Sequence, residues 1–187
     1  MTPAEKQAKD KQKRIQEKIN KKGKKEAFDW AQLTDDLGGK LLTKQEIEKV
    51  RQFLKDKGIH LIVEDDVAKI KFLFKPADGF NSADELFGLL RKKEIKGGAF
   101  DAKNMQLILT LNPSELTSFH ELMHVKHYEE IGREAYLKLN KLEREMYVWE
   151  QVYKSRSKWT KDELQVSFDY INEIRVDEFV LDPIILE

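Results

Sequence analysis

Two histidines one helical turn apart, with a glutamate beside the first, are the residues of this chain best suited to chemistry. His120, Glu121 and His124 form the pattern H-E-x-x-H. Residues four apart on an α-helix differ by about 40° in rotation and about 6 Å along the axis, so both imidazoles leave one face and can bind the same ion. Glu121 lies about 100° round from His120, beside that ion, where a general base for an activated water would stand. The pattern predicts a zinc hydrolase, and the alternative is a solvated surface helix that binds no metal.

The composition restricts the ligands that such a site can use. The chain has 187 residues and no cysteine, which excludes disulfides and thiolate zinc sites and leaves histidine and carboxylate ligands. Zn²⁺ is the usual ion for nitrogen and oxygen donors without thiolates, and a catalytic zinc site has three protein ligands and one open position. A third ligand must therefore join His120 and His124.

The third ligand is expected to be a carboxylate from a later helix. His127 shares a face with His124 but lies about 10 Å along the axis from His120, so we interpret it as a residue near the metal or the substrate. Three glutamates flank the apolar stripe of the next helix, each about 60–80° from its centre, and these angles do not choose among them. They are Glu143, Glu145 and Glu150. Glu173 is the second choice, because the string NEIRVD matches the N-E-x-x-x-D pattern of thermolysin-like peptidases.

Apolar residues at helical spacing predict the helices that position these side chains. The helix with the metal motif is expected to begin after Ser114 and to stop at Gly132. The next helix is expected to run unbroken from Arg133 along a stripe of Ala135, Leu139, Leu142, Met146, Trp149 and Tyr153. Residues 26–58 also have a helical pattern. Capping boxes predict three helix starts, at Thr43 with Glu46, Ser82 with Glu85 and Thr160 with Glu163.

Short apolar runs predict three strands. Residues 59–64 and 68–74 are expected to form a hairpin that turns at Asp65-Asp66, and residues 105–111 a third strand. Gly97-Gly98 is expected to break the chain before that third strand. Because strands are followed by a run of helices, the order favours an α+β domain.

The charge is unevenly distributed along the chain. Residues 1–25 hold ten Lys and Arg against three Asp and Glu, whereas the whole chain is neutral. This segment has few large apolar side chains, which predicts a basic linker, helical or disordered, ahead of a single domain over 26–187. No aromatic residue interleaves its basic residues, so nucleic-acid binding is not expected. The chain has no apolar run of membrane-spanning length and no apolar core of a secretory signal near Met1.

The chain resembles the zincin-like metallopeptidase toxin domains of bacterial polymorphic toxins from about Gly98 to Ile171. The likeness covers the strings GGAFDAKNMQLILTL, FHELMHVKHYEEIGREAYLKL, EREMYVWEQVY and WTKDELQVSFDYI. A strand, an H-E-x-x-H helix, a short link with glycine and an R-E-x-x-V helix form the plan of that family. Arg144-Glu145 corresponds to the R-E pair of the last helix.

The resemblance implies a zincin-like fold and a zinc peptidase. His120, His124 and Glu145 would bind the ion, and Glu121 would be the catalytic base. It further implies a protein or peptide substrate, a cognate immunity protein as partner, and delivery into a target cell as part of a larger secreted toxin, with residues 1–25 as a connector. In zincins the strand beside the active-site helix pairs with the substrate backbone; residues 105–111 are the candidate edge, and an ordinary core strand is the alternative.

Two points stay open at this stage. A non-catalytic binding or regulatory module would keep zinc for structure in a closed site of four ligands, which His127 or Glu150 could complete. The group that stabilises the oxyanion is also undetermined, with four tyrosines near the motif as candidates. They are Tyr128, Tyr136, Tyr147 and Tyr153.

Overall fold

The computed structural model describes residues 41–64, 82–92 and 97–186. All of these residues belong to one compact unit, Leu37–Glu187. The basic segment at 1–25 and the strand expected over 68–74, with its turn at Asp65-Asp66, lie outside the described residues. The linker and the hairpin therefore stay predictions.

Three short strands form the sheet of the described region. They are β1 (His60–Val63), β2 (Gly98–Asp101) and β3 (Gln106–Leu109). The order is β1-β3-β2, with β1 parallel and β2 antiparallel to β3. β3 is hydrogen bonded on both sides and none of its residues is more than 1% exposed. Of the two alternatives for 105–111, the core strand is therefore confirmed and the open substrate edge is wrong.

Gly97-Gly98 does not break the chain, since β2 begins at Gly98. The glycines serve close packing instead. A Cβ on Gly97 would lie 2.6 Å from Cβ of Leu90, and a Cβ on Gly98 would lie 2.4 Å from Cγ of Glu121. A glycine that forms a turn and a glycine that allows a close contact cannot be told apart in a sequence. The pair was therefore interpreted as a break, and the strand that begins at Gly98 was not expected.

The described residues contain six α-helices. They are α2 (Lys44–Asp56), α4 (Ala83–Lys92), α5 (Glu115–Ile131), α6 (Arg133–Lys138), α7 (Lys141–Lys154) and α8 (Lys161–Glu173). Capping boxes start α2 at Thr43 and α8 at Thr160, as predicted, and Ser82 accepts the amide of Glu85 ahead of α4. The predicted α+β class is confirmed. No helix within the described ranges combines the length and apolarity needed to cross a bilayer.

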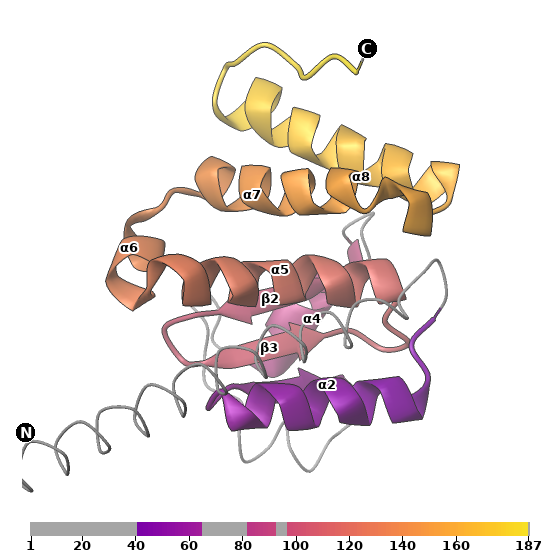
Figure 1. Cartoon of the computed structure of the whole chain (residues 1–187), viewed down its shortest axis with the longest axis vertical. Helices are drawn as coiled ribbons and strands as arrows, with labels where there is room; N and C mark the ends of the chain where they lie inside the picture. The colour runs from indigo at the N-terminus through magenta and orange to yellow at the C-terminus, as the bar shows by residue number, and fades with distance from the viewer. Residues whose placement is uncertain (1–40, 65–81, 93–96, 187) are drawn as a thin grey trace, which may run out of the picture. The chain divides into compact units, whose positions relative to one another are not determined.

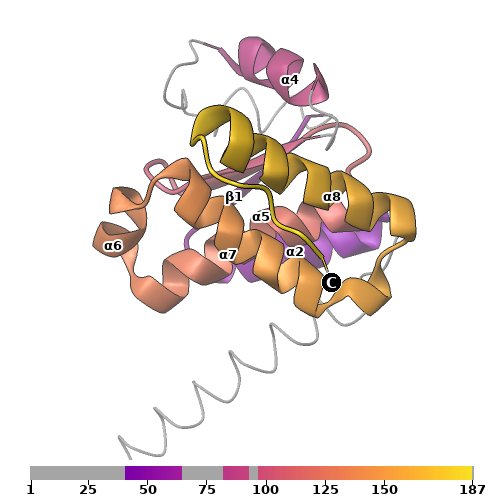
Figure 2. The same cartoon turned by 90° about the horizontal axis from the view of Figure 1, so that it is seen from above.

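Helices α4 and α5 lie against opposite faces of β2. Side chains alternate along a strand, and Ala99 packs against the cluster formed by α4 with Ile62 and Ile108. Gly98 and Phe100 face the other way, toward Glu121 and the Tyr128 ring. Figure 1 shows α5, α7 and α8 stacked in that order beyond the sheet, with α5 contacting α7 and α7 contacting α8. Figure 2 shows the same stack from above, with α4 to one side of it.

The helix expected to run unbroken from Arg133 is two helices, α6 and α7. Leu139 has an extended backbone at ψ 140°, and Asn140 begins α7 with a capping box to Glu143. The side chain of Asn140 satisfies an amide at the start of α7, which makes a new start favourable there. The expected stripe is therefore wrong at its beginning: Ala135 is exposed, and Tyr136 is the buried residue, at 1%.

Candidate metal centre

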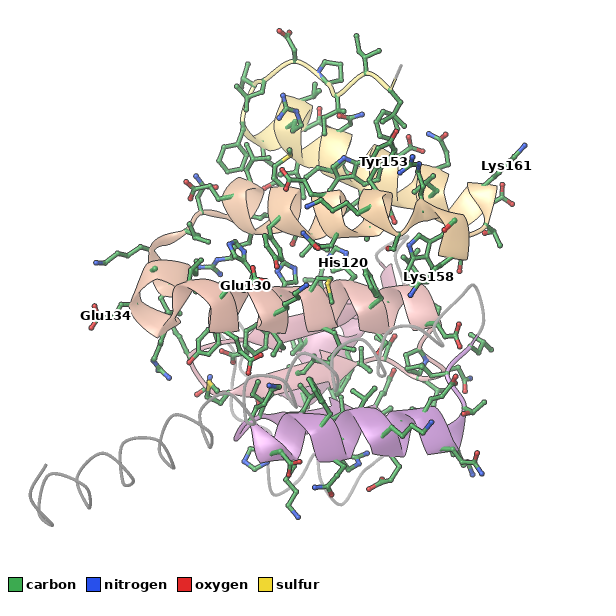
Figure 3. All side chains as sticks on the ribbon, in the orientation of Figure 1. His120, Glu130, Glu134, Tyr153, Lys158 and Lys161 are labelled. Carbon is green, nitrogen blue, oxygen red and sulfur yellow. The ribbon has the colours of Figure 1, made fainter. Side chains whose placement is uncertain are left out.

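Helix α5 carries the H-E-x-x-H motif and is fixed at both ends. Ser114 Oγ accepts the Thr117 amide at 3.0 Å, and Gly132 ends the helix at a φ of 84°, where glycine is favoured. Both boundaries agree with the sequence. The first two-thirds of α5 is almost entirely buried because it lies between β2 and α7. His120 and His124 leave it one turn apart with ring centroids separated by 5.1 Å, and Figure 3 shows His120 on the side toward α7.

Helix α7 brings one carboxylate to both imidazoles. His120 Nε2 lies 3.1 Å from Glu145 Oε2, and His124 Nε2 lies 3.4 Å from Glu145 Oε1. The side chains of His120 and Glu145 are each 12% exposed, and that of His124 is 8% exposed. In the described residues these three are the group of donors that lies close enough to hold one metal ion. Glu145 lies on the side of α7 that packs against α5, so its carboxylate reaches both histidines.

The donor set fits a divalent zinc-like ion. Two ligands bound tetrahedrally to zinc lie about 3.4 Å apart, which agrees with the 3.1 and 3.4 Å between the carboxylate and the imidazoles. Glu145 Oε2 is buried, and its contact with His120 does not have the geometry of a hydrogen bond. A buried carboxylate oxygen without a hydrogen bond is costly, and a cation between the three groups would satisfy it. Burial acts to raise the pKa of Glu145, but His124 and His120 together outweigh it and hold that pKa well below its usual range.

A pocket of about 220 Å³ has these three donors and Glu121 in its wall. Glu121 is 6% exposed and comes from the same turn of α5 as His120. Gly98 to Phe100 of β2 form another part of the wall, and side chains of α6, α7 and α8 form the rest: Tyr136, Lys141, Arg144 and Tyr170. The pocket therefore places a second carboxylate and a strand edge beside the candidate metal centre.

Gly98→Ala is expected to disturb Glu121 without touching the three donors. The new Cβ would lie 2.4 Å from Cγ and 3.0 Å from Oε1 of Glu121. The sequence predicts Glu121 as the general base of a zinc hydrolase, and misplacing such a group by about 1 Å can cost about 10² in rate. On that prediction we expect a loss of about this size in kcat/KM with zinc content unchanged. Gly88→Ala is the matched control, because nothing lies within 4 Å of its Cβ. Full activity of Gly98→Ala would show that Glu121 needs no such placement.

Two tyrosines adjoin the donors. Tyr136 Oη lies 3.2 Å from His124 Nδ1, so Tyr136 can orient that imidazole. Burial raises the pKa of Tyr136. The positive charge of Arg144 acts to lower this pKa, and the negative charges of Glu121 and Glu145 act to raise it. Tyr170 has its ring 6.1 Å from that of His120, and burial, Glu145 and Glu121 raise its pKa.

Tyr170 is a pocket residue that the sequence did not single out. It lies on α8, far along the chain from the motif, and only its place in the string WTKDELQVSFDYI pointed to the site. Of the four tyrosines considered from the sequence, only Tyr136 lines the pocket. Tyr147 donates to Glu130 at 2.7 Å, and Tyr153 packs on Trp149.

The other candidate ligands lie elsewhere. His127 stacks on the Tyr147 ring at 4.0 Å, and burial, followed by the charge of His124, lowers its pKa. Glu143 is bound in the capping box of Asn140. Glu150 and Glu173 are exposed. None of these four belongs to the donor group or the pocket wall.

Comparison with known protein families matches residues 31–177 to the family described as metallopeptidase toxin 4. The match covers the whole of the donor cluster and well over half of the chain. Comparisons with curated proteins and with solved structures found no match. A metal ion and peptidase activity are implied by that family. Because the match covers most of the chain, the chain belongs to the metallopeptidase toxin 4 family.

Proposed function

We propose that this chain is a zinc-dependent peptidase of zincin type, in which His120, His124 and Glu145 bind the ion and Glu121 is the general base. The observation that supports it is the meeting of three donors from two helices at the wall of one pocket. As a toxin domain it would act on proteins of a target cell after delivery, and a cognate immunity protein would protect the producer.

Each residue has a distinct task in this proposal. A bound zinc ion supplies Lewis acidity, which acidifies a water and polarises the scissile carbonyl. Glu121 accepts the proton of the attacking water at its carboxylate and passes it to the leaving amine. In this proposal His124 donates a hydrogen bond from Nδ1–H to Tyr136 Oη, which leaves Nε2 free to bind the ion.

Tyr170 is proposed to stabilise the oxyanion of the tetrahedral intermediate. Its side chain lines the pocket, and a phenol that keeps its proton can donate to developing negative charge. Tyr170→Phe is expected to lower kcat by about 10²-fold, the cost of losing one such donor, with zinc content unchanged. Tyr153→Phe is the control, since Tyr153 does not line the pocket. Equal kcat in both variants would remove Tyr170 from this role.

The substrate is proposed to pair with β2 as an added strand. In the described sheet β2 has one neighbour, β3, and residues Gly98–Phe100 line the pocket. An extended peptide can take up the backbone groups of such an edge. This moves the proposed substrate edge from 105–111 to β2.

A structural zinc module has less support. Closed zinc sites have four protein ligands, whereas three donors meet in the described residues and a pocket adjoins them. His127 and Glu150, the residues that could have completed a closed set, lie outside that group.

Metal removal tests the proposal. Protein purified without added zinc is expected to contain one zinc per chain and to cleave peptides in a bacterial proteome digest, with new termini identified by mass spectrometry. A chelator should abolish cleavage, and one equivalent of zinc should restore it. Cleavage that survives complete zinc removal, or a chain that holds no metal, would contradict the proposal.

A further inference from the structure

Arg144 lines the metal pocket but has no task in the hydrolysis described above. The pocket wall contains two cations, Lys141 and Arg144, both from the beginning of α7. Lys141 is ion-paired with Glu178. No ion pair joins Arg144 to a carboxylate in the part of the chain that the structure describes. One positive charge in the wall is therefore not balanced by a direct partner.

Packing holds the Arg144 guanidinium in place while leaving its donors largely unused. Its central carbon lies 4.9 Å from the ring centroid of Tyr136, a cation–π contact. Its single hydrogen bond, from Nη2 to the Leu137 carbonyl, is 3.5 Å long, and its buried Nε has no hydrogen-bond partner. A hydrogen bond of that length is weak, and a half-buried cation without an ionic partner loses part of its hydration without compensation. An anion that entered the pocket would remove part of this cost.

We infer that Arg144 binds a carboxylate of the peptide substrate and so determines which peptides the pocket accepts. Guanidinium is suited to this because its planar fork of N–H groups matches a carboxylate in two parallel hydrogen bonds. The inference rests on the proposed function, since it places the substrate in the metal pocket. The carboxylate has two sources, the free C-terminus of a peptide or the side chain of an Asp or Glu residue.

The test uses four dipeptides that carry a zinc-binding hydroxamate on an N-terminal acyl group, so that the C-terminus and the side chains can be varied. One pair differs only in a C-terminal carboxylate or carboxamide. The other pair has a C-terminal carboxamide and differs only in an Asp or Asn side chain. Dissociation constants are measured by calorimetry on the zinc-loaded protein and on Arg144→Gln, Arg144→Lys and Lys138→Gln. Lys138 is an exposed cation of α6 that does not line the pocket, so its variant removes the same charge elsewhere.

The protein is expected to bind the charged member of one pair at least about tenfold more tightly than its neutral partner, the size of one charge-assisted hydrogen bond. The pair that shows this preference identifies the source of the carboxylate. Arg144→Gln should abolish the preference, Arg144→Lys should keep part of it, and Lys138→Gln should keep all of it. Each preference is a ratio within one variant, so it does not depend on the fraction of that variant that folds.

Two results would overturn the inference and leave the peptidase site intact. One is equal binding of both members of each pair, and the other is a preference that survives unchanged in Arg144→Gln. Failure of all four compounds to bind the zinc-loaded protein would be a different result, because it would contradict the proposed peptidase site and, with it, the role of Arg144.

Discussion

Glu121→Gln is expected to lower kcat/KM by about 10²–10⁴-fold while the protein keeps its zinc. Glutamine has nearly the shape of glutamate but cannot accept the proton of the attacking water, and general base catalysis contributes about 10²–10⁴-fold. The three donor atoms belong to other residues, so metal binding should not change. Rates of peptide cleavage and zinc content by elemental analysis, measured on the same preparations, check both halves of the prediction.

Glu134→Gln is the matched control for that experiment. Glu134 lies on α6, is exposed and is not part of the pocket wall, and Figure 3 shows it pointing away from α5 and α7. Replacing the Glu134 carboxylate with an amide should leave kcat/KM unchanged. Expression of both variants in bacteria gives a second readout: growth should recover with Glu121→Gln and not with Glu134→Gln. Cleavage by Glu121→Gln within tenfold of the unaltered protein would exclude Glu121 as the base.

Glu145→Ala is expected to weaken zinc binding by at least about 100-fold. Loss of a residue that only orients a ligand costs about 10–100-fold in metal affinity, and loss of a ligand should cost more. The variant also leaves His120 and His124 without the carboxylate that lies 3.1 and 3.4 Å from them. Competition with a chromogenic zinc chelator measures the affinity.

Glu143→Ala separates this effect from damage to α7. Glu143 lies two residues earlier on the same helix and closes its capping box, accepting the Asn140 amide at 2.7 Å. Its loss should cost about 1 kcal/mol of stability and lower Tm by about 2–4 °C, with zinc affinity unchanged. If the two variants bind zinc equally well, Glu145 is not the third ligand.

The helix with the motif was predictable because its signals are local. Ser114 at its beginning, Gly132 at its end and two histidines four residues apart are all read within one segment. The capping boxes at Thr43 and Thr160 were predictable for the same reason. These features depend on hydrogen bonds between residues that are neighbours in the chain.

The remaining parts of the site depend on contacts between distant segments. Helical angles could not choose Glu145 over Glu143 or Glu150, because the side of α7 that meets the histidines is determined by its packing against α5. The resemblance to toxin peptidases, through Arg144-Glu145, made that choice. Tyr170 reaches the pocket only because α8 packs on α7, and no spacing within the sequence contains that information.

The role of Gly98 was misread for a related reason. Its lack of a side chain lets β2 approach Glu121 on another element, a requirement that the local sequence does not reveal. The same glycine would favour a turn in a different surrounding. The sequence, with the resemblance, therefore grouped His120, His124 and Glu145 correctly but missed the strand that forms one wall of their pocket.

Anomalous X-ray diffraction from crystals of the zinc-loaded protein, recorded on both sides of the zinc absorption edge, tests the central claim most directly. We expect one strong zinc peak, about 2.0–2.2 Å from Nε2 of His120, Nε2 of His124 and a carboxylate oxygen of Glu145, with no fourth protein ligand. A peak bound by other side chains, a site closed by a fourth residue, or no peak between α5 and α7 would contradict it.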